Sequence, residues 1–96
     1  MSLDKMTYLS ALLLDEVESV LNDNVVRDTR RFFNASRGNF TVRELLELFF
    51  ISFCKFGLRS VRVAKYKQVI VDAMHVVASK DSNFDVNLAL RCMAGL

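Results

Sequence analysis

The sequence predicts an all-α fold, a compact bundle of four or five helices around a central Phe-rich helix. Its 96 residues suffice for one domain, residues 1–96, with a modest core. The chain has no proline and only three glycines, whereas a small all-β protein would need many tight turns made of those residues. Residues 40–57 carry the signals of a helix start and a helix end, and apolar residues occupy all sides of this segment. Such a helix is stable in water only when other helices cover it.

The first helix is expected over about residues 3–21. Its apolar residues recur three and four positions apart, as on one helix face: Met6, Leu9, Leu13, Val17 and Val20. Asn22-Asp23-Asn24 predicts the end of this helix and the cap of a shorter second helix, about residues 25–33. The residues expected to face inward on the second helix are Val25, Thr29 and Phe32, with Val26 and Phe33 as further candidates. Residues 34–39 are rich in turn formers and predict a loop.

The third helix is the Phe-rich one, and both of its ends can be predicted. Thr41 and Glu44 have the spacing of a capping box, in which each side chain binds the backbone amide of the other residue. Gly57 suits the left-handed residue that follows a helix end, and Leu58 can then fold back on Phe53.

The fourth helix is expected to follow Ser60 and to end at about Ser79. It is dense in β-branched residues, which also suit a strand, so a strand at residues 68–71 is the alternative. The spacing of the apolar residues favours a helix: Val63, Tyr66, Ile70, Ala73 and Val77. Ser82 and Asp85 form a second capping-type pair, which predicts a final helix over about residues 83–94.

Charge is segregated along the chain. Residues 27–67 have a net charge of +7, whereas residues 1–26 have −4 and residues 68–96 have −1. This basic block is a candidate surface for binding the RNA backbone without sequence preference, as some silencing suppressors do, with Tyr66 or Phe40 as a stacking face, although the modest net charge of +2 favours the alternative. The candidate nucleic-acid-binding residues are Arg27, Arg30, Arg31, Arg37, Lys55, Arg59, Arg62, Lys65 and Lys67. The alternative is a solvated basic face, or one that pairs with the acidic face of the first helix in the same or a neighbouring subunit.

The apolar content favours self-association. Apolar residues make up 52% of this small chain, more than one bundle of this size is expected to bury. A homodimer is therefore expected. The candidate contact residues are Leu12, Leu14, Phe32, Phe33, Phe50 and Leu96.

Catalytic and metal-binding patterns are missing, so no enzymatic activity, metal or cofactor is expected. His75 is the single histidine, and Asp72 lies three residues before it, but nothing nearby marks a nucleophile. Cys54 and Cys92 stand apart and inside apolar patterns, which favours free thiols in a reducing, cytoplasmic compartment. No signal peptide is evident, and the apolar run at residues 45–56 is too short to span a membrane.

The short uninterrupted domain, the Phe-rich helix at residues 45–56 and the Asn/Asp-rich loops at residues 22–24 and 80–83 resemble the small accessory proteins of plus-strand RNA plant viruses. Proteins of that kind often self-associate, bind RNA or interfere with host factors. The resemblance implies a non-catalytic, self-associating interaction protein with a host or viral protein partner, or alternatively an RNA-binding protein. It assigns no individual residue.

Overall fold

Five α-helices make up the part of the chain that this computed structural model describes, which is residues 3–36 and 40–96, with side chains from residue 8 onward. They are α1 (Leu3–Val20), α2 (Asn24–Ala35), α3 (Val42–Lys55), α4 (Ser60–Lys80) and α5 (Val86–Ala94). These residues contain no strand, so the predicted all-α fold is confirmed and the alternative of a strand at residues 68–71 is wrong. Met6, which the sequence predicts on the apolar face of the first helix, lies before the first described side chain.

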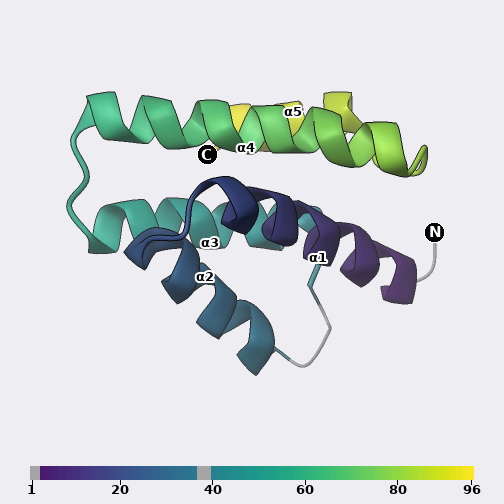
Figure 1. Cartoon of the computed structure of the whole chain (residues 1–96), viewed down its shortest axis with the longest axis horizontal. Helices are drawn as coiled ribbons and strands as arrows, with labels where there is room; N and C mark the ends of the chain where they lie inside the picture. Colours follow the sequence, from purple (N-terminus) through teal and green to yellow (C-terminus); the bar gives the residue numbers. More distant parts are fainter. Residues whose placement is uncertain (1–2, 37–39) are drawn as a thin grey trace.

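Two helices, α1 and α3, lie side by side in the middle of the bundle (Figure 1). α1 packs against α2, α3 and α4, while α3 packs against α1, α2 and α5. In Figure 1, α4 forms the top layer with α5 behind it, and α2 lies below. The Phe-rich helix is therefore central, as predicted, but α1 is central as well.

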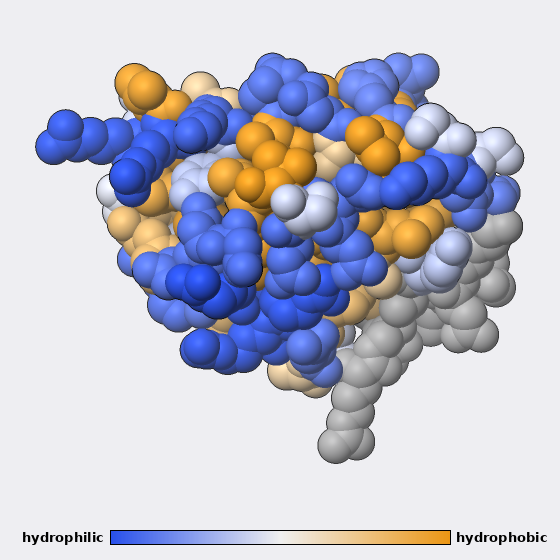
Figure 2. Space-filling view, in the orientation of Figure 1, coloured by the Kyte–Doolittle hydropathy of each residue, from blue (hydrophilic) through white to orange (hydrophobic). Residues whose placement is uncertain are grey.

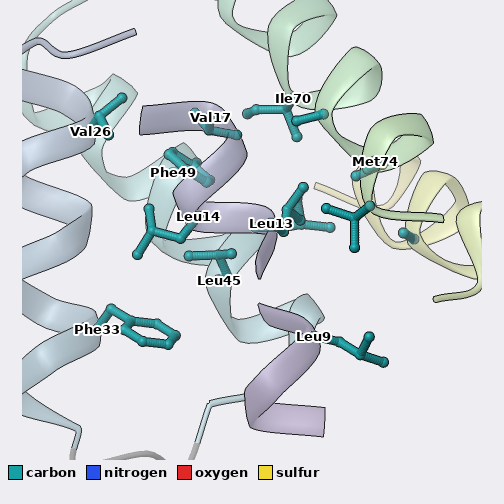
Figure 3. Packing of buried hydrophobic residues seen from close by; sticks show 14 of the residues in the cluster. Leu9, Leu13, Leu14, Val17, Val26, Phe33, Leu45, Phe49, Ile70 and Met74 are labelled. Carbon is teal, nitrogen blue, oxygen red and sulfur yellow. The ribbon is translucent and has the colours of Figure 1, made fainter. Parts of the chain in front are cut away.

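The core lies on two sides of α1. Leu13 and Leu14 are neighbours in sequence, and both are fully buried. Figure 3 shows Leu13 directed toward Met74 of α4, and Leu14 directed the other way, toward the side of α2. Because α1 is covered from two sides, it needs a wider apolar surface than a single stripe. Leu14 (0% exposed) and Phe33 of α2 (9% exposed) are therefore core residues, which corrects the expectation that they serve self-association.

Local interactions define both ends of α3. The Thr41 hydroxyl accepts the Glu44 amide at 3.2 Å and the Glu44 carboxylate accepts the Thr41 amide at 3.4 Å, so the predicted capping box is present. At the other end Gly57 has a φ of 60°, and the Leu58 amide donates to the Phe53 carbonyl at 3.2 Å. This left-handed turn determines the direction in which the chain leaves α3.

The start of α5 differs from the prediction. We expected Ser82 to cap this helix, but the helix begins after Asp85, whose carboxylate accepts the amide of Leu88 at 3.0 Å. The reason is Phe84, whose ring is buried and whose amide donates to the carbonyl of Asp81 at 3.1 Å. Because burial of that ring holds the preceding residues in a turn, the helix begins after it.

α4 is buried only along its second half. Its buried residues have the spacing of one helix face: Ile70, Ala73, Met74 and Val77. No residue before Ile70 in this helix is buried, and Val63 and Tyr66 are only partly covered. The first half of α4 therefore presents most of its side chains to solvent, and these include several of the predicted basic residues.

Candidate nucleic-acid interface

Three helix ends meet at one end of the bundle: the end of α3, the start of α4 and the start of α2 (Figure 1, left). The link between α3 and α4 is short, and the left-handed Gly57 lets the chain turn immediately after α3. Residues from all three ends line two depressions in the surface, which adjoin because they share Asn24 and Phe56. The fold thus gathers side chains that are far apart in the sequence.

The larger depression, of about 470 Å³, lies between the start of α2 and the first half of α4. Arg62, Lys65 and Tyr66 line it from α4. The Tyr66 hydroxyl donates a hydrogen bond to the carboxylate of Asp23, which also accepts the Val26 amide and thereby caps α2. This hydrogen bond, followed in importance by burial, raises the pKa of Tyr66 above its ordinary value of 10.0. Asp23 therefore ties the start of α2 to α4.

The smaller depression, of about 370 Å³, lies between α2 and the end of α3. Arg27, Arg31 and Lys55 line it, around the buried carboxylate of Asp28. One Asp28 oxygen lies 3.0 Å from the Lys55 ammonium and 3.9 Å from the Arg31 guanidinium. The other oxygen accepts the Ser52 hydroxyl at 3.5 Å. A buried carboxylate needs such partners to offset its lost hydration, so this cluster holds α2 against α3.

Two partly exposed aromatic rings flank Lys55. Its ammonium nitrogen lies 5.9 Å from the ring centroid of Phe32 and 5.7 Å from that of Phe56. At these distances a cation is attracted to the negative face of an aromatic ring. Aromatic side chains therefore stand among the cations of the smaller depression.

Among the predicted basic residues that the structure describes, Arg30, Arg59 and Lys67 line neither depression. Arg30 pairs with Asp15 at 2.5 Å and with Glu18 at 3.0 Å, so for this residue the alternative of pairing with the first helix holds. Lys67 lies 5.0 Å from the centroid of an aromatic ring of α3 and lines neither depression. Arg37 is outside the described residues. The five basic residues that line the depressions, together with Arg59, which directly precedes α4, we name the cationic end: Arg27, Arg31, Lys55, Arg59, Arg62 and Lys65.

Acidic side chains within the described residues are engaged inside the chain. In addition to those above, Glu16 binds Lys80, Glu47 binds Arg43, Asp72 binds Gln68, Asp81 binds Asn83, and Glu44 and Asp85 cap helices. By contrast, Arg59, Arg62 and Lys65 form no ion pair with any side chain that the structure describes. Figure 2 shows long hydrophilic side chains projecting where α4 begins. Six arginines and lysines whose side chains the structure describes form no ion pair; four of them, Arg27, Arg59, Arg62 and Lys65, belong to the cationic end, and the other two are Lys67 and Arg91.

The candidate self-association residues do not form one surface patch. Leu14 and Phe33 are buried in the core, and Leu12 and Phe50 are half-buried against it. Phe32 and Leu96 remain exposed. On the face seen in Figure 2, apolar side chains form separate patches between hydrophilic ones. Much of the apolar surplus is therefore inside the bundle.

The other predicted contacts are partly corrected. Asp72, three residues before His75, accepts a hydrogen bond from Gln68 at 2.9 Å. Phe40 packs on a ring of α2 at the start of α3, a whole helix away from the cationic end, and is not a stacking face there. Cys54 is exposed rather than buried, and it is a free thiol. Among the described residues, no cluster of three or more His, Cys, Asp or Glu side chains could hold a metal ion, and no helix is long and apolar enough to cross a membrane.

Sequence reasoning missed two residues of this site. Asp28 is one of three acids within the basic block at residues 27–67, and nothing local in the sequence indicates that it is buried against α3. Phe56 could have been found from the sequence. It directly precedes Gly57, whose left-handed conformation marks the turn between α3 and α4, so it must lie where the two helices meet. Its exposure, at 39%, follows from that position.

No protein-family model, curated protein or solved structure matches this chain.

Proposed function

We propose that this protein is a non-catalytic RNA-binding protein that holds the phosphate backbone at the cationic end. One observation carries the proposal: five basic residues from three helices line two adjoining depressions, and a sixth, Arg59, directly precedes α4. Arg59, Arg62 and Lys65 form no ion pair with a described residue and are exposed. Positive charge that the fold does not use internally is available to an external anion.

Backbone phosphates suit this surface. Each bound phosphate releases counterions from the RNA, and the contact requires no particular base. Four of the six residues are arginines, whose planar guanidinium can donate two parallel hydrogen bonds to a phosphate. The resemblance to accessory proteins of plus-strand RNA plant viruses lends further support, since such proteins often bind RNA.

The test is a fluorescence-anisotropy titration with labelled RNA at low salt. We compare the wild type with Arg62→Glu, Lys65→Glu and the control Arg91→Glu. All three substitutions change the net charge equally, but Arg91 lines neither depression. We expect the first two to weaken binding about tenfold or more, since each removes a phosphate contact and adds repulsion. The control should bind nearly as well as the wild type.

Two results would contradict this proposal. One is the absence of binding at tens of micromolar protein, a concentration at which non-specific nucleic-acid binding is normally seen. The other is an equal loss in all three variants, because it would indicate a general charge effect. The same titration with vesicles containing phosphatidylserine distinguishes RNA from an anionic membrane as the ligand. Binding to vesicles without binding to RNA would assign the cationic end to anionic lipid.

Self-association is the second function that we propose, and an apolar depression beside α5 supports it. This depression, of about 380 Å³, lies between α1, the start of α3 and α5. Leu9, Val42, Phe84 and Leu88 contribute to its lining, and Leu88 is itself 53% exposed. A two-fold dimer joins the same patch of both copies. Leu88 of one copy can then enter the depression of the other.

Light scattering at micromolar concentration tests this second proposal. We expect a dimer, and we expect Leu88→Lys to shift the mass to the 11.0 kDa of the monomer. The control is Ile51→Lys, which places the same charge on an exposed apolar position of α3 outside this depression. A monomeric wild type, or a dimer that survives Leu88→Lys, would remove the proposal.

A further inference from the structure

We propose that the RNA bound at the cationic end is single-stranded, and that one of its bases stacks on the ring of Phe56. This inference rests on the proposed RNA binding and adds the class of RNA and the residue that contacts a base. Phe56 lines both depressions, so its ring stands where they join, with Arg62 and Lys65 on one side and Arg27 and Arg31 on the other.

The surroundings of Phe56 are those of a stacking platform. Its ring is partly exposed, and the Lys55 ammonium lies 5.7 Å from its centroid. Proteins that bind single strands combine cations that follow the backbone with aromatic rings on which bases stack. Every base has an aromatic face, so this contact also tolerates any sequence.

Tyr66 is less suited to this role, although it lines the larger depression. Its ring already packs on Phe53, with the two centroids 5.5 Å apart and the planes inclined by 25°. Its hydroxyl is engaged by Asp23. Tyr66 therefore forms part of the wall of the depression, and Phe56, which is 39% exposed, is the better candidate for stacking.

The size of the site also favours a single strand. The molecule measures 36 × 26 × 25 Å, and the cationic end gathers around two hollows where three helix ends meet. Domains that bind double-stranded RNA contact successive grooves over about 16 base pairs and read its shape, with the bases inaccessible to aromatic side chains. A compact concave site suits a strand whose bases can turn inward while its phosphates meet the surrounding cations.

The experiment compares a 12-nucleotide single-stranded RNA with the duplex of the same sequence, by anisotropy at one salt concentration. We expect the single strand to bind about tenfold more tightly. Phe56→Leu, which keeps an apolar side chain but removes the ring, should lose about tenfold of that affinity, within the range measured for base–aromatic stacking. Phe56→Tyr should retain it. Ile51→Ala, at an exposed position outside both depressions, should have no effect.

A second measurement does not depend on the folding of a variant. RNA carrying 5-iodouridine, irradiated in complex with the wild type, should cross-link to the peptide that contains Phe56. Equal affinity for the duplex, unchanged binding by Phe56→Leu, or a cross-link elsewhere would overturn the inference while RNA binding itself stood. If neither RNA bound the wild type, the proposed function would fail as well, so the two failures are distinguishable.

Discussion

The carboxylate of Asp28 limits how much positive charge the smaller depression presents. It is buried, and it draws on both Lys55 and Arg31. Asp28→Asn removes this negative charge and keeps a side-chain oxygen that can accept the Ser52 hydroxyl. We therefore expect RNA to bind several-fold more tightly, and the free energy of unfolding to fall by about 1 kcal/mol, since Lys55 is half exposed and its ion pair is screened.

Anisotropy and urea denaturation check both parts of this prediction. Asp72→Asn is the control, because it changes the net charge equally but lies on α4 outside both depressions. If the two variants gained affinity equally, the gain would come from net charge alone. If Asp28→Asn bound more weakly than the wild type, Asp28 would have a positioning role that its contacts do not indicate.

The hydrogen bond from Tyr66 to Asp23 should make part of the stability depend on alkaline pH. The pKa of Tyr66 is raised in the folded protein by this bond and by burial. The stabilisation is therefore fully present below the unfolded-state pKa of about 10, and it is lost as the pH rises through the higher folded-state value. Tyr66→Phe keeps the ring packing on Phe53 but removes the bond. It should cost about 1 kcal/mol at pH 7.

Urea denaturation of the wild type and Tyr66→Phe, repeated from pH 7 to pH 11, measures this dependence. The difference in the free energy of unfolding should be constant up to about pH 10 and should shrink above it. A difference that grew with pH would contradict the sign of the shift. Equal stability at pH 7 would mean that the hydrogen bond contributes nothing measurable.

At the scale of the element, the start of α4 departs from what favours a helix. Arg59 occupies the capping position without a side-chain hydrogen bond, and the first turn has no acidic residue. A positive charge at this end opposes the helix dipole, whereas aspartate would cap the helix and complement that dipole. Local choices that reduce stability are expected at functional sites. The position of Arg59 is thus consistent with a role in binding.

This conflict predicts a trade-off in Arg59→Asp. The new cap should add about 1 kcal/mol of stability, which raises the Tm of a domain of this size by roughly 4–8 °C. RNA binding should weaken, because a cation is replaced by an anion. Arg59→Ala is the companion variant: it should lose affinity without the gain in Tm. A stabilised Arg59→Asp that binds RNA as well as the wild type would exclude Arg59 from the interface.

Local signals predicted α3 better than α5. The capping box and the Gly57 turn involve residues within a few positions of each other, so the ends of α3 could be inferred from the sequence. The cap of α5 could not be inferred in this way. Phe84 is buried in the core, and the helix is capped by Asp85, which follows it, rather than by Ser82. Phe32 shows the same limit: the sequence placed it inward, but its neighbour Phe33 is the buried ring.

The sequence predicts a set of basic residues for the candidate site, but not how the fold arranges them. The sequence identified the basic block, and it could not separate Arg30, which α1 neutralises, from the residues that remain available. That separation depends on how α2 packs against α1. The two depressions likewise depend on the start of α2 meeting the end of α3 and the start of α4, from which it is distant in sequence. Periodicity places a residue on one helix face, and it does not show which helix lies opposite.

At the scale of the whole molecule, internal pairing concentrates the free positive charge. Ion pairs, hydrogen bonds and caps engage the acids along the described chain, and four of the six described basic residues without an ion pair lie at the cationic end. A net charge of +2 therefore understates the local field that an RNA would meet. Binding driven by such a local field should depend steeply on salt.

The salt dependence separates the two kinds of contact proposed for this site. For single strands, the logarithm of the binding constant falls by about 0.7 per phosphate contact for each tenfold rise in salt. If about four of the six cations bind phosphates, the slope should be about −3. Arg62→Ala should make the slope shallower by about 0.7, while Arg91→Ala leaves it unchanged. Phe56→Leu should lower the affinity at every salt concentration with the slope intact, because stacking releases no counterions. A slope near zero in the wild type, or one that Phe56→Leu alters and Arg62→Ala does not, would mean that the cationic end is not what holds the RNA.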